Sequence, residues 1–418
     1  MTQKRVKKML YRLKRLIACI LTLITCLSPF GAFAASPPSF EDIAEAIDAA
    51  LTCARDAYGD GETLFSEAML ETAGSSISDW YAIVAGRTGA SEDYEKYLSS
   101  LNAYVSEMYA EPDLLDRSRA TEWHRISLAI AAIGGDPSSF GKNGDIDLIA
   151  DGTYAWSHTN SLGRQGINGF IWALIALDSL RYEVPGDAVY TREDIITQIL
   201  SRQLSGGGFA LGGFSADADI TAMALQALAP YYGSDAEYTY SSDGGADVKS
   251  TVTAVIDEAL QCLSEMQGPD GGFSSIDGTS SESISQVIIA LCSLNIDPAR
   301  DSRFIKDGGS AYDALMRFQT PEGGFAHSAD SDGVFSLNPM ANEQALLALT
   351  AMARLYGGYR PLYDFRGEPE RVLLIGSSSK VADELPETEG SPMLIIGSLL
   401  LIIAAFTAVT IIKKRRTN

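Results

Sequence analysis

Hydrophobic segments that lack a polar face recur along this chain and alternate with amphipathic ones. Four of them contain almost no strongly polar side chain: residues 126–133 (ISLAIAAI), 170–177 (FIWALIAL), 287–294 (VIIALCSL) and 345–352 (ALLALTAM). A fifth, residues 220–231 (ITAMALQALAPY), has Gln226 as its one strongly polar side chain. A helix that is apolar on every side must be buried on every side, so other helices must surround these segments.

The segments between them have the pattern of surface helices. From Tyr94 to Tyr109, and again over 195–200 and 248–266, apolar residues recur at i, i+3 or i+4 and i+7. Residues 41–58 and 308–319 are similar, and signals for strands are nearly absent. The sequence therefore predicts an all-α protein in which amphipathic helices form a shell around buried ones.

The buried segments repeat at drifting intervals of 43 to 65 residues, near Trp80, Trp123, Trp172, Thr221, Gln286 and Glu343. Such a period is typical of stacked helix pairs. An open solenoid would also satisfy it. Six pairs are nevertheless enough to close a ring, and we expect a closed α6/α6 toroid, a barrel of helical hairpins, over residues 35–365.

A common turn precedes several of the buried helices. Residues 203–209, 267–273 and 319–325 share the plan Gln-x-x-x-Gly-Gly-Phe, and residues 151–156 look like a decayed copy. Glycine tolerates the positive φ of a tight turn, and the phenylalanine can pack back between neighbouring hairpins. We interpret these segments as structural turns and not as catalytic loops.

Charge excludes one class of partner. The chain has 32 basic and 54 acidic residues, and residues 35–384 hold 21 of the basic and 52 of the acidic ones. A surface of this sign repels phosphate backbones. We therefore expect no nucleic-acid partner.

The N-terminus predicts export. Residues 4–15 carry seven Lys and Arg side chains, Leu16 to Leu27 is apolar, and Ala32-Phe33-Ala34 has the small-x-small pattern of a cleavage site. This order is typical of a signal peptide, which we place at residues 1–34. The alternative, an uncleaved anchor helix, needs a longer apolar run than these 12 residues.

The C-terminus predicts a surface anchor. Residues 393–412 form an apolar stretch of 20 residues, long enough to cross a bilayer, and the basic tail 413–418 should stay in the cytoplasm. In the linker 366–392, residues 385–390 (LPETEG) resemble the LPXTG sorting signal of Gram-positive surface proteins, with Glu389 in place of glycine. Wall attachment by sortase and simple membrane anchoring are both open, and both put the body at the cell surface.

The cysteines do not indicate a metal or a disulfide framework. Beyond the signal peptide three remain, Cys53, Cys262 and Cys292, and none forms a CxxC pair. Cys262 and Cys292 fall on apolar helical faces, where we expect buried thiols.

Together, the turns and buried helices resemble a known superfamily. The Gln-x-x-x-Gly-Gly-Phe turns are similar to the repeats of squalene and hopene cyclases and of prenyltransferase β-subunits. Residues 217–228 (DADITAMALQAL) are most similar to bacterial surface toroids related to the α-domain of transcobalamin and intrinsic factor. The resemblance covers roughly residues 40–365 and implies an α6/α6 barrel. Because this fold carries cyclases, transferases and vitamin carriers alike, it implies no single activity.

As an enzyme, the chain would resemble a terpene (squalene or hopene) cyclase. Those cyclases protonate their substrate with the central acid of a DxDD motif, which here reads Asp217-Ala218-Asp219-Ile220. Asp219 is thus the candidate acid, but the fourth carboxylate and the second helical domain of such cyclases are missing. Prenyl transfer would need zinc ligands, and His327 and Cys292 sit in no recognisable ligand pattern. We expect no catalytic residue, metal or cofactor, with cyclase-like or prenyltransferase-like activity as the alternative.

Binding would use the same residues differently. The inner helices of a toroid all run the same way, so acids near their N-termini gather at one mouth: Asp79, Glu122, Asp217, Asp219, Glu282 and Glu343. These acids can cap the helices or contact a ligand. They cancel the positive field of the helix ends, which favours neutral or cationic groups over anions. The predicted ligand-binding residues are Asp217, Asp219, Glu282, Glu343, Gln286, Gln344, Trp123 and Trp172.

The sequence therefore predicts an exported, surface-anchored toroid that binds a small molecule or a surface glycan without converting it. Its other expected partners are the membrane, through residues 393–412, and sortase. A corrinoid site of the transcobalamin kind would need a second domain to close it, and residues 366–384 are too few to form one. A purely structural surface role is also open.

Overall fold

The computed structural model describes residues 36–112, 114–241, 247–275 and 278–367. The expected signal peptide (1–34), the LPXTG-like motif, the expected membrane helix (393–412) and the basic tail (413–418) lie outside these residues. Within the described part of the chain, no helix combines the length and the apolar character that a membrane span requires.

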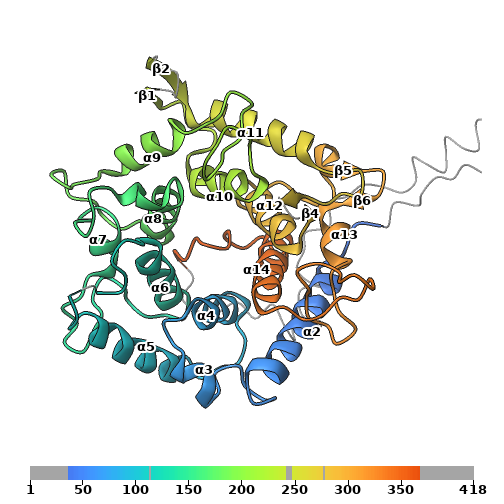
Figure 1. Cartoon of the computed structure of the whole chain (residues 1–418), viewed down its shortest axis with the longest axis horizontal. Coiled ribbons are helices and arrows are strands. Elements are labelled where there is room, and N and C mark those ends of the chain that lie inside the picture. Colours follow the sequence, from blue (N-terminus) through green and yellow to red (C-terminus); the bar gives the residue numbers. More distant parts are fainter. Residues whose placement is uncertain (1–35, 113, 242–246, 276–277, 368–418) are drawn as a thin grey trace, which may run out of the picture. The chain divides into compact units, whose positions relative to one another are not determined.

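Six buried helices form the inner wall of a ring: α4 (Ser76–Thr88), α6 (Thr121–Ala132), α8 (Asn168–Ser179), α10 (Ala218–Leu228), α12 (Ser281–Ser293) and α14 (Pro339–Tyr356). Each packs against the next, and α14 packs against α4, so the ring closes (Figure 1). The structure therefore confirms the α/α toroid and rules out the open solenoid. Each of the six inner segments expected from the sequence is one of these helices.

Outer helices cover the ring: α2 (Phe40–Tyr58), α3 (Glu67–Glu71), α5 (Tyr94–Met108), α7 (Leu148–Gly152), α9 (Arg192–Leu200), α11 (Val252–Met266) and α13 (Ala311–Met316). Four of them, α7, α9, α11 and α13, pack on α6, α8, α10 and α12. The first outer helix, α2, packs on the last inner helix, α14. The two ends of the described chain are thereby locked together.

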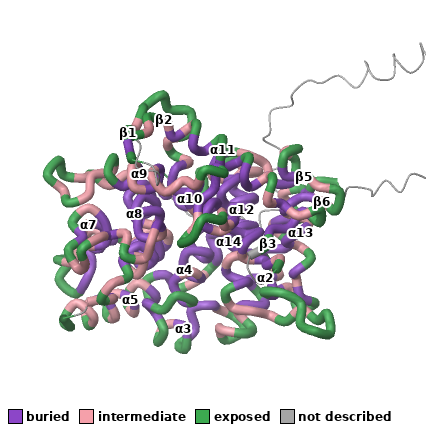
Figure 2. Tube along the Cα trace, turned by 45° about the horizontal axis from the view of Figure 1, so that its top comes forward, coloured by how far each residue is buried: buried purple, intermediate pink, exposed green. Residues whose placement is uncertain are grey.

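The inner and outer helices differ in burial in the way that their sequences predict. In α12 every residue from Ser283 to Cys292 is buried, whereas α11 buries one stripe that includes Val252, Ile256 and Leu263. Figure 2 shows the buried inner ring and the mixed outer layer. The inner helices are thus the core of the protein.

The repeated turns have a shared internal hydrogen bond. The Nε2 atoms of Gln203, Gln267 and Gln319 each donate to a carbonyl four residues on, at 2.8, 2.9 and 3.0 Å. The accepting residues are Gly207, Gly271 and Gly323, whose φ angles are 85°, 85° and 96°. The phenylalanines that end the three turns, Phe209, Phe273 and Phe325, are fully buried. The glutamine therefore stabilises the turn by a hydrogen bond, the glycine adopts the positive φ that the turn requires, and the phenylalanine packs in the core.

The sequence did not predict the short hairpins on the outer side. β1 (Glu237–Ser241) pairs antiparallel with β2 (Asp247–Thr251), β3 (Ser274–Ser275) with β4 (Gly278–Thr279), and β5 (Ile305–Lys306) with β6 (Gly309–Ser310). Three 3₁₀ turns, Leu162–Gln165, Ala229–Tyr231 and Ser302–Phe304, complete the connections. Strands this short carry too few residues for a period-two pattern to be visible.

A C-terminal segment, residues 357–367, crosses one end of the ring (Figure 1). Arg87, at the end of α4, donates to the carbonyls of Pro361 and Asp364 at 3.0 and 3.1 Å. The amide of Phe365 donates to the carbonyl of Ser179, the last residue of α8, at 2.8 Å. This segment therefore covers the mouth formed by the C-terminal ends of the inner helices.

Candidate functional site

The opposite mouth is formed by the N-terminal ends of the inner helices. Asp79, in the first turn of α4, contacts Arg125 of α6 at 3.0 Å, and Asp219, in the first turn of α10, accepts a hydrogen bond from Ser283 of α12. Contacts between first turns show that neighbouring inner helices run the same way. We call the group Asp79, Glu122, Asp217, Asp219, Glu282 and Glu343 the acidic mouth.

One side of the acidic mouth is fully paired. Asp79 is buried and accepts from the Gly74 amide at 3.0 Å, the Tyr97 hydroxyl at 2.8 Å and Arg125 at 3.0 Å. Arg125 also donates to Glu122 at 2.6 Å. These acids hold α4, α5 and α6 together, which is a structural role.

Asp217 is a helix cap. It is the N-cap residue of α10, and its side chain accepts from the Ile220 amide at 3.0 Å. This bond satisfies one of the amides that a helix start leaves without an intrahelical partner. The first acid of the DADI motif is therefore accounted for by the helix itself.

Asp219 can accept a further hydrogen bond. Its Oδ1 atom is buried and has no hydrogen-bond partner among the described residues. Burial raises the pKa of its carboxyl group to about 6, against the Ser283 hydrogen bond that lowers it, and the charges of Asp217 and Glu282 add to the rise. Asp219 is thus ionised at neutral pH but readily protonated just below it.

Glu343, on α14, is the most perturbed acid of the group. It is 3% exposed, and its Oε2 atom has no hydrogen-bond partner in the part of the chain that the structure describes. Burial raises the pKa of Glu343 to about 9, with Arg125 opposing the rise and Glu282 adding to it. At neutral pH Glu343 is therefore a neutral acid that can donate as well as accept.

Glu282 links the mouth to an outer loop. Its Oε2 atom lies 2.8 Å from Nδ1 of His327, a residue 45 positions later whose side chain is 49% exposed. This pair could not be predicted from the sequence, because the two residues are brought together only by the packing of α12 against the loop before α14.

A row of glutamines runs along three neighbouring inner helices. Gln226 of α10 donates to the Gln286 side chain of α12 at 2.9 Å, and Gln286 donates to Gln344 of α14 at 3.0 Å. Two of these, Gln286 and Gln344, were expected at the site. Gln226 had been singled out only as a polar interruption, and it extends the row towards the covered mouth.

Of the two tryptophans expected at the site, only Trp172 lies on the inner side of the ring. The ring of Trp172 is 5.3 Å from that of Trp80 and 5.8 Å from that of Tyr363 in the C-terminal segment. Trp123 is fully buried elsewhere, with its ring against Trp156 and His158 and its Nε1 donating to Tyr109. Its ring is therefore turned to the outer layer and does not join the other predicted residues.

The histidines are engaged separately. Nε2 of His124 donates to the Gly152 carbonyl at 2.6 Å, and burial lowers the pKa of His124 to about 4. His158 stacks on Trp123, and His327 pairs with Glu282. Across the described ranges, no group of three or more His, Cys, Asp or Glu side chains is arranged to hold a metal ion.

Comparison with known proteins relates part of the chain to a known toroid domain. The model of the prenyltransferase alpha-alpha toroid domain matches residues 153–336. The resemblance to the prenyltransferase-like toroids is confirmed. No curated protein sequence matches the chain.

Solved structures of the same class of toroid are distant. The type II terpene cyclase MstE from Scytonema is 13% identical, with a TM-score of 0.44 over 76% of this chain and 100% of that one. The ent-copalyl diphosphate synthase from Streptomyces platensis is 18% identical, with a TM-score of 0.39 over 67% of this chain and 50% of that one. At these identities and scores, neither structure indicates a substrate for the present toroid.

Proposed function

We propose that the toroid binds a small polar ligand at its acidic mouth without converting it. The observation that carries this proposal is the pair of unpaired carboxyl oxygens, Oδ1 of Asp219 and Oε2 of Glu343, on the two helices that flank α12. A buried polar atom without a partner costs about 1–3 kcal/mol. A ligand that donates hydrogen bonds to both oxygens would recover that cost.

The charges of the mouth limit the class of ligand. Asp219 and Glu282 disfavour an anion. The protonated carboxyl group of Glu343 can either donate a hydrogen bond to a ligand or accept one from it. Trp80 and Trp172 add aromatic faces, which suit a sugar ring or an ammonium group. The ligand is therefore a neutral or cationic polar molecule, such as a glycan unit.

Acid catalysis is the second candidate. Asp219 is the central acid of residues 217–220, which resemble the DxDD motif that supplies the proton in terpene cyclases. Its pKa of about 6 means that it becomes protonated just below neutral pH. Ile220, 6% exposed, replaces the fourth carboxylate of the motif. Without that neighbour the acid has less support for protonating a hydrocarbon, so we place cyclase-like activity second.

We further propose that the toroid works at the cell surface. The support is the sequence of the two ends: the signal-like residues 1–34, the apolar stretch 393–412 and the LPXTG-like motif with Glu389. Membrane anchoring through the apolar stretch needs no enzyme, whereas wall attachment needs sortase.

A paired assay separates binding from catalysis. The wild-type protein and its Asp219→Asn and Glu343→Gln variants are titrated calorimetrically with N-acetylglucosamine and with choline, and incubated with squalene and geranylgeranyl diphosphate. Asp93→Asn is the control for loss of an acid at a helix start, because Asp93 caps the outer helix α5 and is not one of the acids of the mouth. We expect one of the two polar probes to bind wild type and the control, and to bind either site variant at least about tenfold more weakly.

Conversion of either isoprenoid by the wild-type protein would contradict this proposal. If wild type cyclises either isoprenoid and Asp219→Asn does not, the protein is an enzyme. If neither polar probe binds and neither isoprenoid is converted, the acidic mouth is a structural feature.

A further inference from the structure

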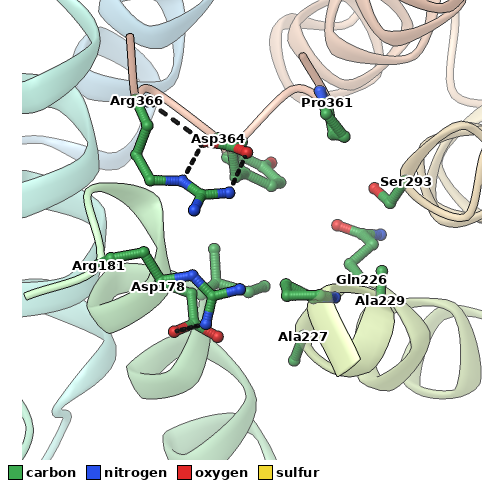
Figure 3. A pocket seen from close by; sticks show the side chains of 12 residues that line it. Asp178, Arg181, Gln226, Ala227, Ala229, Ser293, Pro361, Asp364 and Arg366 are labelled. Carbon is green, nitrogen blue, oxygen red and sulfur yellow. Dashed lines mark hydrogen bonds and ion pairs between the residues drawn. The ribbon is translucent and has the colours of Figure 1, made fainter. Parts of the chain in front are cut away.

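A cavity lies at the covered mouth, at the opposite ends of the inner helices from the acidic mouth. Its volume is about 260 Å³, and it lies between the C-terminal ends of α8, α10 and α12 and the C-terminal segment that roofs it (Figure 3). Its polar lining residues include Asp178, Arg181, Gln226, Tyr363, Asp364 and Arg366.

Gln226 presents an unpaired acceptor to this cavity. Its side chain is 5% exposed, and Nε2 donates to both the backbone carbonyl and the side-chain Oε1 of Gln286, at 3.1 and 2.9 Å. Because both partners are acceptors, the amide nitrogen must face them and cannot exchange places with Oε1. Oε1 therefore points into the cavity, as Figure 3 shows, and has no hydrogen-bond partner among the described residues.

The charged residues of the cavity lining are two aspartates, Asp178 and Asp364, and two arginines, Arg181 and Arg366. Asp178 accepts from Arg181 at 3.3 Å, from Arg192 at 3.0 Å and from the Tyr231 hydroxyl at 2.7 Å. Its charge is thus already shared by two arginines.

The roof repeats this arrangement. Asp364 is held by both Nε and Nη2 of Arg366, at 2.9 and 2.7 Å, and by Arg360 at 3.3 Å. Four arginines therefore contact these two carboxylates, and two of them, Arg181 and Arg366, line the cavity. In Figure 3 the guanidinium groups of Arg181 and Arg366 lie across the open space from Gln226.

We propose that this cavity binds a small carboxylate that carries a hydrogen-bond donor, that is, an α-hydroxy acid or an amino acid. The carboxylate is recognised by Arg181 and Arg366, since guanidinium groups match carboxylates in charge and shape. The hydroxyl or ammonium group donates to Oε1 of Gln226. At ~30 Å³ per water-sized group, the cavity has room for roughly six to nine non-hydrogen atoms.

This site is distinct from the acidic mouth, and the two are joined by the glutamine row and by the contact of Tyr363 with Trp172. It lies at the other ends of the inner helices and selects the opposite charge. Because part of its wall is the C-terminal segment, an occupant bridges that segment to α8 and α10.

The test uses L-lactate, L-alanine and propionate as probes of the full-length protein by calorimetry at pH 7. Propionate has the carboxylate but lacks the donor, so we expect lactate or alanine to bind about tenfold more tightly than propionate. Whichever of the two binds identifies the donor as hydroxyl or ammonium. Gln226→Leu should reduce that advantage to nothing, and Arg366→Gln should weaken binding of the preferred probe about tenfold.

Arg303→Gln is the matched control. Arg303 holds Asp301 with the same two atoms at 2.9 and 2.8 Å, two residues apart and similarly exposed, but away from the cavity. It should bind like wild type. The proposal is overturned if lactate and alanine bind no better than propionate, or if Arg303→Gln loses as much affinity as Arg366→Gln. The second comparison still decides if Gln226→Leu does not fold, because Arg366 is a partly exposed residue.

Discussion

Glu343 and Asp219 differ from the paired acids of the acidic mouth because each keeps a buried carboxyl oxygen without a partner in the described part of the chain. Both have a pKa above the ordinary value, about 9 for Glu343 and about 6 for Asp219, with burial as the main cause. A carboxyl group with a raised pKa binds its proton more tightly in the folded state than in the unfolded state. Stability is therefore fully present at low pH and is lost as the pH rises towards the folded pKa.

Replacing Glu343 by glutamine should remove this pH dependence. We expect the free energy of unfolding of Glu343→Gln to increase relative to that of wild type as the pH rises from 5 to 8. The increase should be up to about 1.4 kcal/mol per pH unit. For Asp219→Asn the gain should level off above pH 6 to 7, because its folded pKa is lower. Urea unfolding at pH 5, 6.5 and 8 measures both. A difference that does not change with pH would show that Glu343 is ionised in the folded protein.

The acids and glutamines of the site could be predicted from sequence because they recur at the same places on similar helices. Their pairing could not. Arg125 satisfies Asp79 across two helices, and His327 reaches Glu282 from a loop. Trp123 was misplaced for a related reason: a tryptophan near a helix start can face inwards or outwards, and the packing of Trp156 and His158 decides which. Tyr363 had no signal, since it lies after the last repeat.

At the scale of single elements, the repeated turn was predicted as structural, and two of its neighbouring glycines allow a direct test. Gly207 has φ +85°, and an added Cβ would lie 2.6 Å from the carbonyl oxygen of Glu258. Gly206 precedes it, without a positive φ and with nothing within 4 Å of an added Cβ.

Gly207→Ala should therefore destabilise the protein by about 1–3 kcal/mol, and Gly206→Ala should leave it unchanged or slightly more stable. Thermal unfolding followed by circular dichroism gives the comparison. Equal losses in the two variants would mean that the turn is not held in the conformation described.

The hairpins and the C-terminal segment mark the limit of sequence reasoning at this scale. Periodicity identifies helices well when they are long and repeated. It cannot show that residues 357–367 cross the ring, because that path depends on bonds from Arg87 and Ser179 that are more than 175 residues away in the chain. The cavity beneath the segment was unpredictable for the same reason.

At the scale of the whole molecule, ring closure has a consequence for folding. Since α2 packs on α14, a defect at the N-terminal helix is felt by the last repeat, unlike in an open solenoid, where each repeat contacts only its neighbours. Ile47, in α2, is fully buried.

Ile47→Ala should lower the stability of the entire toroid by about 2–4 kcal/mol in a single transition. Circular dichroism, which reports on helices, and tryptophan fluorescence, which reports on the packing of the four tryptophans, should give coincident curves. Two separate transitions, with the N-terminal part melting first, would instead indicate solenoid-like behaviour.

Ligand binding at the acidic mouth is the central property proposed for this toroid. The most direct measurement is native mass spectrometry of the full-length protein purified from its own culture, with Asp93→Asn and an Asp219→Asn/Glu343→Gln double variant in parallel. We predict that wild type and Asp93→Asn carry the same added small-molecule mass, and that the double variant, folded by circular dichroism, has lost it. A bare wild-type protein, or an added mass that the double variant retains, would contradict ligand binding by Asp219 and Glu343.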